Sequence, residues 1–171
     1  MAEPAAKSET VSVARYDGDF YAWTQEQAQR MRELAAALHG QRDPLAQRID
    51  FENVAEEIES LGRSDKRAIK RRLKVLLLHL LKWAYQPERR SKSWEATIFE
   101  QRQRISDLIA ESPSLTAYPG EVLAGEYALA RKGAAGETGL PEETFPVACP
   151  FSIHQILDSA WLPPVVRNGS L

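Results

Sequence analysis

The chain has 171 residues, 43 % of them hydrophobic and 27 % charged, and its 22 basic and 24 acidic side chains give a net charge of −2. This composition excludes a mainly disordered chain, a collagen-like repeat and a wholly basic nucleic-acid coat. The single cysteine, Cys149, excludes an intramolecular disulfide. Because no apolar run approaches the roughly 20 residues that cross a bilayer, we expect a soluble, cytoplasmic protein without a membrane partner.

Three segments are expected along the chain. The sequence predicts a disordered leader over residues 1–15, a helical domain over residues 16–162 and a tail over residues 163–171. The first helix follows a turn at residues 16–19 and ends near His39, because Gly40 is a common helix-ending residue. Its apolar side chains recur every three or four residues, which is typical of a helix that packs on one side.

Residues 50–85 are the most informative stretch. At about 100° per residue, the apolar side chains before and after Gly62 fall on the same side of one helix. A break at Gly62 would have no reason to preserve that phase, so the pattern favours one helix about 54 Å long. The alternative is a helix that ends at Gly62 and a second helix capped by Ser64. Pro87 ends the helical stretch, because proline disfavours a helical conformation in the residue before it.

Helical spacing continues in the second half of the chain. One helix is expected from Ser91 to Glu111, and another over about residues 119–135, with Pro119 in its first turn. The region that follows is rich in proline and aromatic residues, which predicts an ordered loop over the bundle. Within it, Ser152 and Gln155 have the spacing of a capping box and predict one short helix. The fold class is therefore all-α, a single-domain helical bundle around one long helix.

Positive charge is concentrated in the middle of the chain, where residues 63–92 hold 11 basic and 2 acidic side chains. Six of these cations share one side of the long helix, opposite its apolar stripe. We call them the basic ridge: Arg63, Lys66, Arg67, Lys70, Arg71 and Lys74. Only Glu59 is well placed to pair with Arg63 along the helix, so the helix's own acids are expected to neutralise little of the ridge. The ridge predicts a non-enzymatic binding protein that contacts a nucleic acid, another polyanion or an acidic protein. The alternative is a solvated face, or one paired with acids of another helix.

Arg72 and His79 lie outside the ridge and share a face of the same helix. An arginine and a histidine separated by six residues on one helix resemble the signature of HEPN-type ribonucleases, in which the pair acts on the scissile phosphate of RNA, usually at a dimer interface. That chemistry needs a proton-transfer group and a cation for the developing charge. The second hypothesis is therefore a metal-independent ribonuclease that uses Arg72 and His79. A hydrogen-bonded histidine in an apolar helix and an arginine paired across the bundle are the structural alternatives.

No other residue set predicts a cofactor or a metal. The carboxylates near residue 56 lack the Glu-x-x-His pairs that di-metal bundles use, and Cys149 has no basic neighbour in sequence that would lower its pKa. We therefore expect no cofactor, no metal site and a packed Cys149 thiol. A helix as long as that over residues 50–85 can also mediate self-association, so a homo-oligomer is a further expectation.

Several short motifs together resemble a known family. They are YDGDFYAW at 16–23, EEIESLG at 56–62, HLLKWAYQP at 79–87, RRS at 89–91 with SW at 93–94, ETGLP at 137–141 and CPF at 149–151. Over about residues 16–162 the chain is similar to the "domain of unknown function 29" family of small helical bacterial proteins. The resemblance implies an all-α fold, and it supplies no activity, cofactor or catalytic residue.

Overall fold

The computed structural model describes residues 15–40, 44 and 46–166. Nearly all of the predicted disordered leader, and the end of the predicted tail, lie outside these residues. Within them there is no strand, so the all-α fold class is confirmed. The helices are α1 (Phe20–Leu38), α2 (Phe51–Tyr85), α3 (Lys92–Glu111), α4 (Tyr118–Thr138) and α5 (Ile153–Leu157), with 3-10 turns η1 (Ala46–Arg48), η2 (Pro87–Arg89), η3 (Pro113–Leu115) and η4 (Glu142–Thr144). None of these helices combines the length and the apolar character that a membrane crossing requires.

Helix α2 organises the molecule. It spans 35 residues and passes through Gly62 without a break, as expected from the phase of its apolar residues, so the alternative start at Ser64 does not describe it. The Asp50 side chain caps its first turn by accepting a hydrogen bond from the backbone N–H of Asn53. The helix ends at Tyr85, immediately before Gln86 and Pro87.

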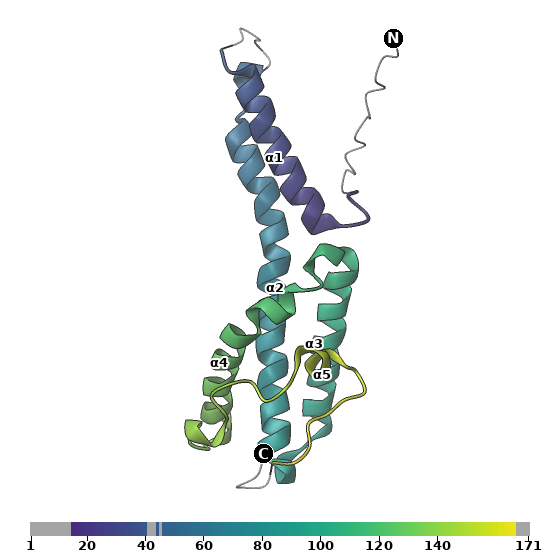
Figure 1. The fold of residues 1–171 in the computed structure, drawn as a ribbon, viewed down its shortest axis with the longest axis vertical. Coiled ribbons are helices and arrows are strands. Elements are labelled where there is room, and N and C mark those ends of the chain that lie inside the picture. Colours follow the sequence, from purple (N-terminus) through teal and green to yellow (C-terminus); the bar gives the residue numbers. More distant parts are fainter. Residues whose placement is uncertain (1–14, 41–43, 45, 167–171) are drawn as a thin grey trace, which may run out of the picture.

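The two halves of α2 belong to different parts of the molecule (Figure 1). Its first half, residues 51–62, pairs with α1 as a helical hairpin, which we call the arm. Its second half forms the body together with α3 and α4, which lie on either side of it, and with the C-terminal segment 139–166. The buried core lies in the body and includes Leu73, Leu77, Leu80, Ile98, Ile105, Tyr127, Ala134, Phe145 and Ile156.

Small residues bring the two helices of the arm close together. Thr24, Ala28 and Ala55 have no exposed surface, and Gly62 faces α1 so closely that a Cβ atom there would lie 2.2 Å from Thr24 Oγ1. Because small side chains make the closest contact between the helices, the larger apolar residues of the arm lie beside that contact and stay partly exposed. Leu34 is 43 % exposed, Val54 40 % and Leu61 54 %.

The C-terminal segment is held to the body by polar contacts as well as by its rings. The hydroxyl of Tyr127 donates to the carbonyl of Pro146 at 2.7 Å, and the Arg131 guanidinium donates to two further carbonyls of this segment. Ser152 and Gln155 form a capping box at the start of α5, as their spacing predicts. Helix α4 runs to Thr138, past its predicted end near residue 135, and stops where Gly139 takes a positive φ of 74°.

Candidate functional site

The first cation of the basic ridge is already neutralised within α2. The Arg63 guanidinium pairs with Glu56 and, at 3.4 Å, with Glu59. The pair of Arg63 with Glu59 is the one expected from the sequence, and Glu56 is a second acid of the same helix that the i,i+4 spacing does not indicate. An arginine side chain is long enough to reach a carboxylate two turns away as well as the one at the preceding turn. The Arg63 charge is therefore paired within the arm and stabilises it.

Two further ridge cations are engaged by neighbouring helices. The Lys66 ammonium lies between two aromatic rings, 4.7 Å from the centroid of Tyr21 and 4.8 Å from that of Tyr118. Lys70 pairs at 3.3 Å with Glu126 of α4, whose side chain is only 7 % exposed. At Lys70 the ridge is paired with an acid of another helix, which is one of the alternatives that the sequence leaves open. Glu126 was not foreseen, although an acid among apolar residues of a helix is a signal for such a partner.

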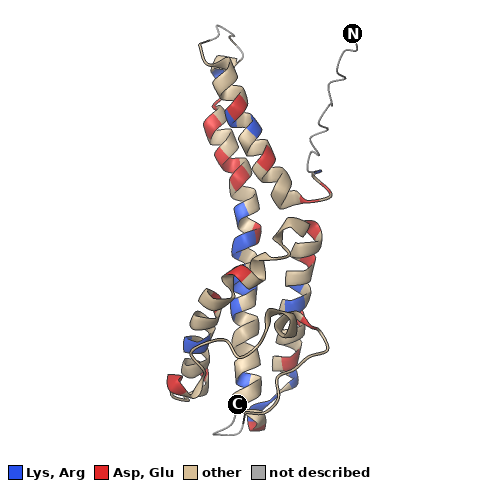
Figure 2. Cartoon of the chain, in the orientation of Figure 1, with Lys and Arg blue, Asp and Glu red and all other residues tan. Residues whose placement is uncertain are grey.

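Arg67, Arg71 and Lys74 form the part of the ridge that remains available, and we call these three residues the basic row. All three are exposed, and none has an ion-pair partner among the residues that the structure describes. Their spacing of four and three residues places them on one side of α2 along about 10.5 Å of the helix. Figure 2 shows positive charge along the middle of α2, beyond the acidic residues of the arm.

Arg72 and His79 occupy separate environments. Arg72 donates from Nη1 to Gln101 Oε1 of α3 at 3.2 Å, so it is held by a neutral amide across the bundle. Together with Arg104 and Asp107 it lines a groove between α2 and α3. His79 is half-buried, and its Nδ1 lies 2.9 Å from the carbonyl oxygen of Val75. As a donor to that carbonyl, Nδ1 carries the ring proton and Nε2 keeps a lone pair.

Burial lowers the pKa of His79, because the charged imidazolium loses hydration, and the nearby Lys82 ammonium adds to this effect. The hydrogen bond to Val75 opposes the shift, and the Glu137 carboxylate does so more weakly. With a folded-state pKa below the ordinary value of 6.5, the unfolded chain takes up the proton first as the pH falls. The contribution of His79 to stability is therefore complete above that value and is lost as the pH falls below it.

Replacing His79 by glutamine should remove this pH-dependent loss. Urea unfolding measured at about pH 7.5 and about pH 5.5 is expected to show a smaller decrease in the free energy of unfolding for His79→Gln than for the wild type. His154→Gln is the matched control, since His154 is exposed on α5, and its pH dependence should follow that of the wild type. An unchanged pH dependence in His79→Gln would show that other groups cause the loss.

The other candidates from the sequence do not converge on a metal or a nucleophile. Within residues 15–40, 44 and 46–166, no group of three or more His, Cys, Asp or Glu side chains lies close enough together to hold a metal ion. The Cys149 thiol is half-buried and donates to the carbonyl of Phe151 at 3.4 Å. Burial raises the pKa of this thiol, which fits the packed side chain expected from the sequence.

Comparison with known proteins gives a fold and a family. No curated protein matches the chain. A crystal structure of an alpha-helical protein of unknown function from Rhodospirillum rubrum ATCC 11170 is similar, with a TM-score of 0.67 and 23 % sequence identity, covering 86 % of this chain and 92 % of the other. At that identity the similarity shows the fold alone. The family model described as "Domain of unknown function DUF29" matches residues 15–162. The chain therefore belongs to this family, as the motifs from Tyr16 to Phe151 indicate.

Proposed function

We propose that this chain is a non-enzymatic binding protein whose basic row holds a polyanion. The observation that carries the proposal is that Arg67, Arg71 and Lys74 are exposed on one side of a helix, with no ion-pair partner in the described part of the chain. Cations spaced along a rigid helix match the regular negative charges of a phosphate backbone. An acidic protein segment offers the same charge, and the experiment below separates the two.

The surroundings of the row favour binding by charge over reading of bases. The nearby rings of Tyr21 and Tyr118 already hold the Lys66 ammonium, so they do not support base stacking beside the row. Helix α2 is packed against α1, α3 and α4, which fixes the backbone that carries the three cations. We therefore propose a contact that depends on salt and not on sequence.

Neutralising the row should abolish most of the binding. In the triple variant Arg67→Gln, Arg71→Gln, Lys74→Gln, fluorescence anisotropy with labelled RNA or duplex DNA should show weaker binding. The dependence of log K on log salt should become shallower by about 3, since each phosphate contact contributes about 1. The control is Arg89→Gln, Lys92→Gln, Lys132→Gln, which removes the same charge from exposed positions outside the row and should bind like the wild type. Equal losses in both triple variants would refute the row as the site. Binding of polyglutamate but not of nucleic acid would replace the polyanion with an acidic protein.

The second candidate is a metal-independent ribonuclease that uses Arg72 and His79. One observation supports it: with Nδ1 held by the carbonyl of Val75 and the pKa of the ring lowered, His79 presents a neutral Nε2 that can accept a proton. Running the RNA from the binding assay on a denaturing gel tests this candidate. RNA that is cleaved by the wild type and left intact by His79→Ala would establish it, and RNA that stays intact with the wild type would exclude it.

A further inference from the structure

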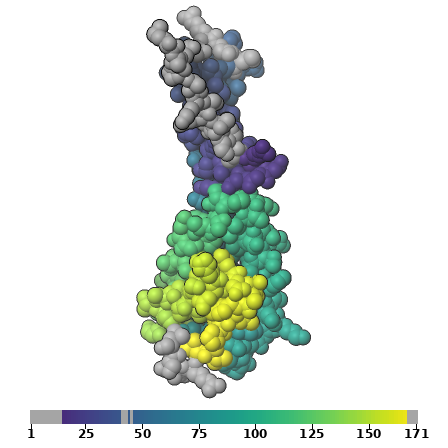
Figure 3. Space-filling view, turned by 45° about the vertical axis from the view of Figure 1, so that its right-hand side comes forward, coloured from purple at the N-terminus to yellow at the C-terminus, as the bar shows by residue number. Residues whose placement is uncertain are grey.

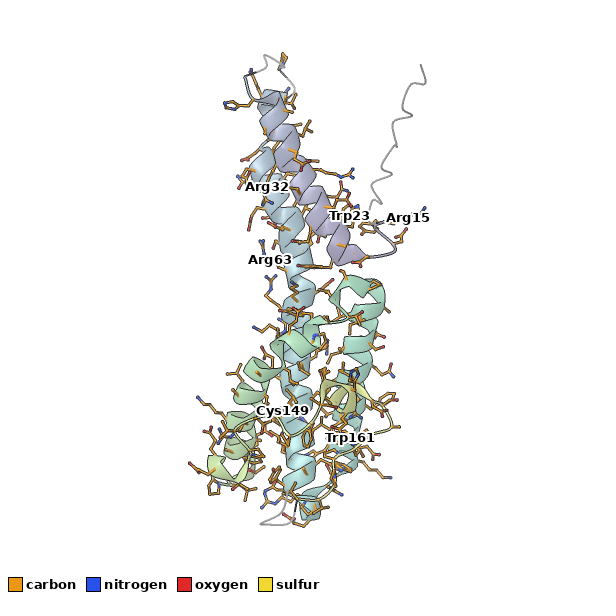
Figure 4. All side chains as sticks on the ribbon, viewed as in Figure 1. Arg15, Trp23, Arg32, Arg63, Cys149 and Trp161 are labelled. Carbon is orange, nitrogen blue, oxygen red and sulfur yellow. The ribbon has the colours of Figure 1, made fainter. Side chains whose placement is uncertain are left out.

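The arm has two sides, each formed by one surface of α1 and one surface of α2, and the two sides carry different side chains. On one side, Arg32 of α1 pairs at 3.2 Å with Glu52 and at 2.9 Å with Glu59 of α2, so these charges are paired within the arm. These contacts raise the pKa of Arg32 and lower that of Glu59, chiefly through the hydrogen bond between the two side chains. Figure 4 shows Arg32 and Arg63 on one side of the arm and Trp23 on the other.

The opposite side of the arm is apolar and, among the described residues, partly exposed. At about 100° per residue, Leu34 and Leu38 lie across α1 from Arg32, and Val54, Ile58 and Leu61 lie across α2 from Glu56. We call these five residues the arm face. The three on α2 line a shallow hollow that is almost entirely apolar. Leu34, Val54 and Leu61 are among the exposed large apolar side chains of the described residues. Figure 3 shows the narrow arm above the wider body.

We propose that the arm face pairs with the arm face of a second copy of this chain. A pair of helices cannot enclose a core, whereas two such hairpins laid face to face complete a four-helix bundle with the apolar residues inside. Thr24, Ala28 and Ala55 are fully buried in the arm, whereas the larger side chains of Leu34, Val54 and Leu61 are exposed to a partner. Identical chains bring identical faces, which is the condition for a twofold-symmetric dimer.

The size of the arm face suits this partner. In the arm, α1 has 19 residues and α2 contributes residues 51–62, which are about 28 Å and about 18 Å of helix, and two helices side by side are about 20 Å wide. Two faces of roughly 350–550 Å² each would bury roughly 700–1,100 Å² in total, which is around the ~1,000 Å² lower limit of a specific interface. A dimer at this lower limit is expected to be in reversible exchange with the monomer.

The charged side chains beside the arm face lie at its outer edges. Arg30, at the α1 edge, already pairs with Glu26 one turn earlier, and Asp50 and Glu57 lie beside the α2 edge. In a face-to-face dimer these residues form the polar rim of the contact, and the apolar side chains lie inside it. The basic row lies on another side of α2, so the dimer leaves it exposed and presents two rows. The proposal does not depend on what the row binds.

Light scattering coupled to size-exclusion chromatography tests the dimer with the full chain. The wild type should approach twice its chain mass of 19.2 kDa as its concentration rises towards about 100 µM, a Kd range that fits a small interface. The double variant Val54→Ser, Leu61→Ser should remain a monomer at that concentration. Leu34→Ser, on the other helix of the arm, should shift the equilibrium in the same direction.

The matched control is Leu129→Ser, Val147→Ser, which changes two exposed apolar residues of the body and should leave the dimer intact. Circular dichroism should show the same helix content for all four proteins, because each substituted side chain is already exposed. A wild type that stays monomeric at about 100 µM, or a dimer that survives both arm variants, would overturn the proposal. Loss of the dimer in the body control would do the same.

Discussion

Replacing Arg102 by methionine is expected to lower the free energy of unfolding by about 3–4 kcal/mol. Arg102 lies on α3 and is only 5 % exposed. Its guanidinium donates to the carbonyls of Ile156 and Trp161, each at 2.8 Å, and to that of Gln155 at 3.5 Å. Methionine fills a similar volume but leaves these acceptors in the protein without donors, and the cost of each buried unsatisfied group is about 1–3 kcal/mol.

Urea unfolding of Arg102→Met and of the wild type measures this difference. Arg104→Met is the control, since Arg104 is an exposed arginine two residues further along the same helix, and its effect should stay within about 0.5 kcal/mol. The C-terminal segment should also become more sensitive to proteolysis in Arg102→Met, because the guanidinium connects that segment to α3. A loss below about 1 kcal/mol would contradict the role of Arg102 in holding this segment to α3.

Gly62→Ala is expected to destabilise the protein by about 2 kcal/mol, although alanine is normally the better helix former by about 1 kcal/mol. The added Cβ would lie 2.2 Å from Thr24 Oγ1 and 3.1 Å from Tyr21 Cδ2. Thr24 is fully buried and its hydroxyl donates to the carbonyl of Tyr21 at 2.7 Å, so it has little freedom to move away. Overpacking of this kind costs about 1–3 kcal/mol, and the lost hydrogen bond adds about 1 kcal/mol.

A double-mutant cycle tests the cause directly. Adding Thr24→Ala to Gly62→Ala removes the oxygen that the new methyl group would meet, so the double variant should be more stable than Gly62→Ala alone. Gly125→Ala is the control, because its Cβ would meet nothing within 4 Å, and it should stabilise the protein by about 0.5–1 kcal/mol. If Gly62→Ala also stabilises the protein, this result would contradict a close approach of α1 to α2 at Gly62.

The path of the backbone could be predicted largely from local patterns. The phase of the apolar residues on either side of Gly62 indicates a continuous α2, and Ser152 with Gln155 indicates the start of α5. The sequence does not show why a glycine is tolerated in the middle of α2. That reason is the approach of Thr24, which lies 38 positions earlier in the chain. Contacts between distant segments depend on which faces pair, and periodicity within one helix does not contain that information.

The same limit explains what was missed at the candidate site. A single helix places the six ridge cations on one side, but Lys66 and Lys70 are engaged by Tyr118 and Glu126 of α4. Sequence spacing groups Arg67, Arg71 and Lys74 with the other ridge cations and does not separate them from those that neighbouring helices engage. It also assigned the apolar residues of the arm to a packed stripe, whereas Leu61 is 54 % exposed.

The salt dependence of polyanion binding by the wild-type protein tests the proposed function most directly. Anisotropy of a labelled DNA duplex should be measured at about 50 mM and about 200 mM monovalent salt. Three phosphate contacts, made by Arg67, Arg71 and Lys74, predict a slope of about −2.7 in log K against log salt, so the affinity should fall about 40-fold between these two concentrations. No binding at the lower salt concentration, or an affinity that does not change with salt, would contradict a polyanion site on α2.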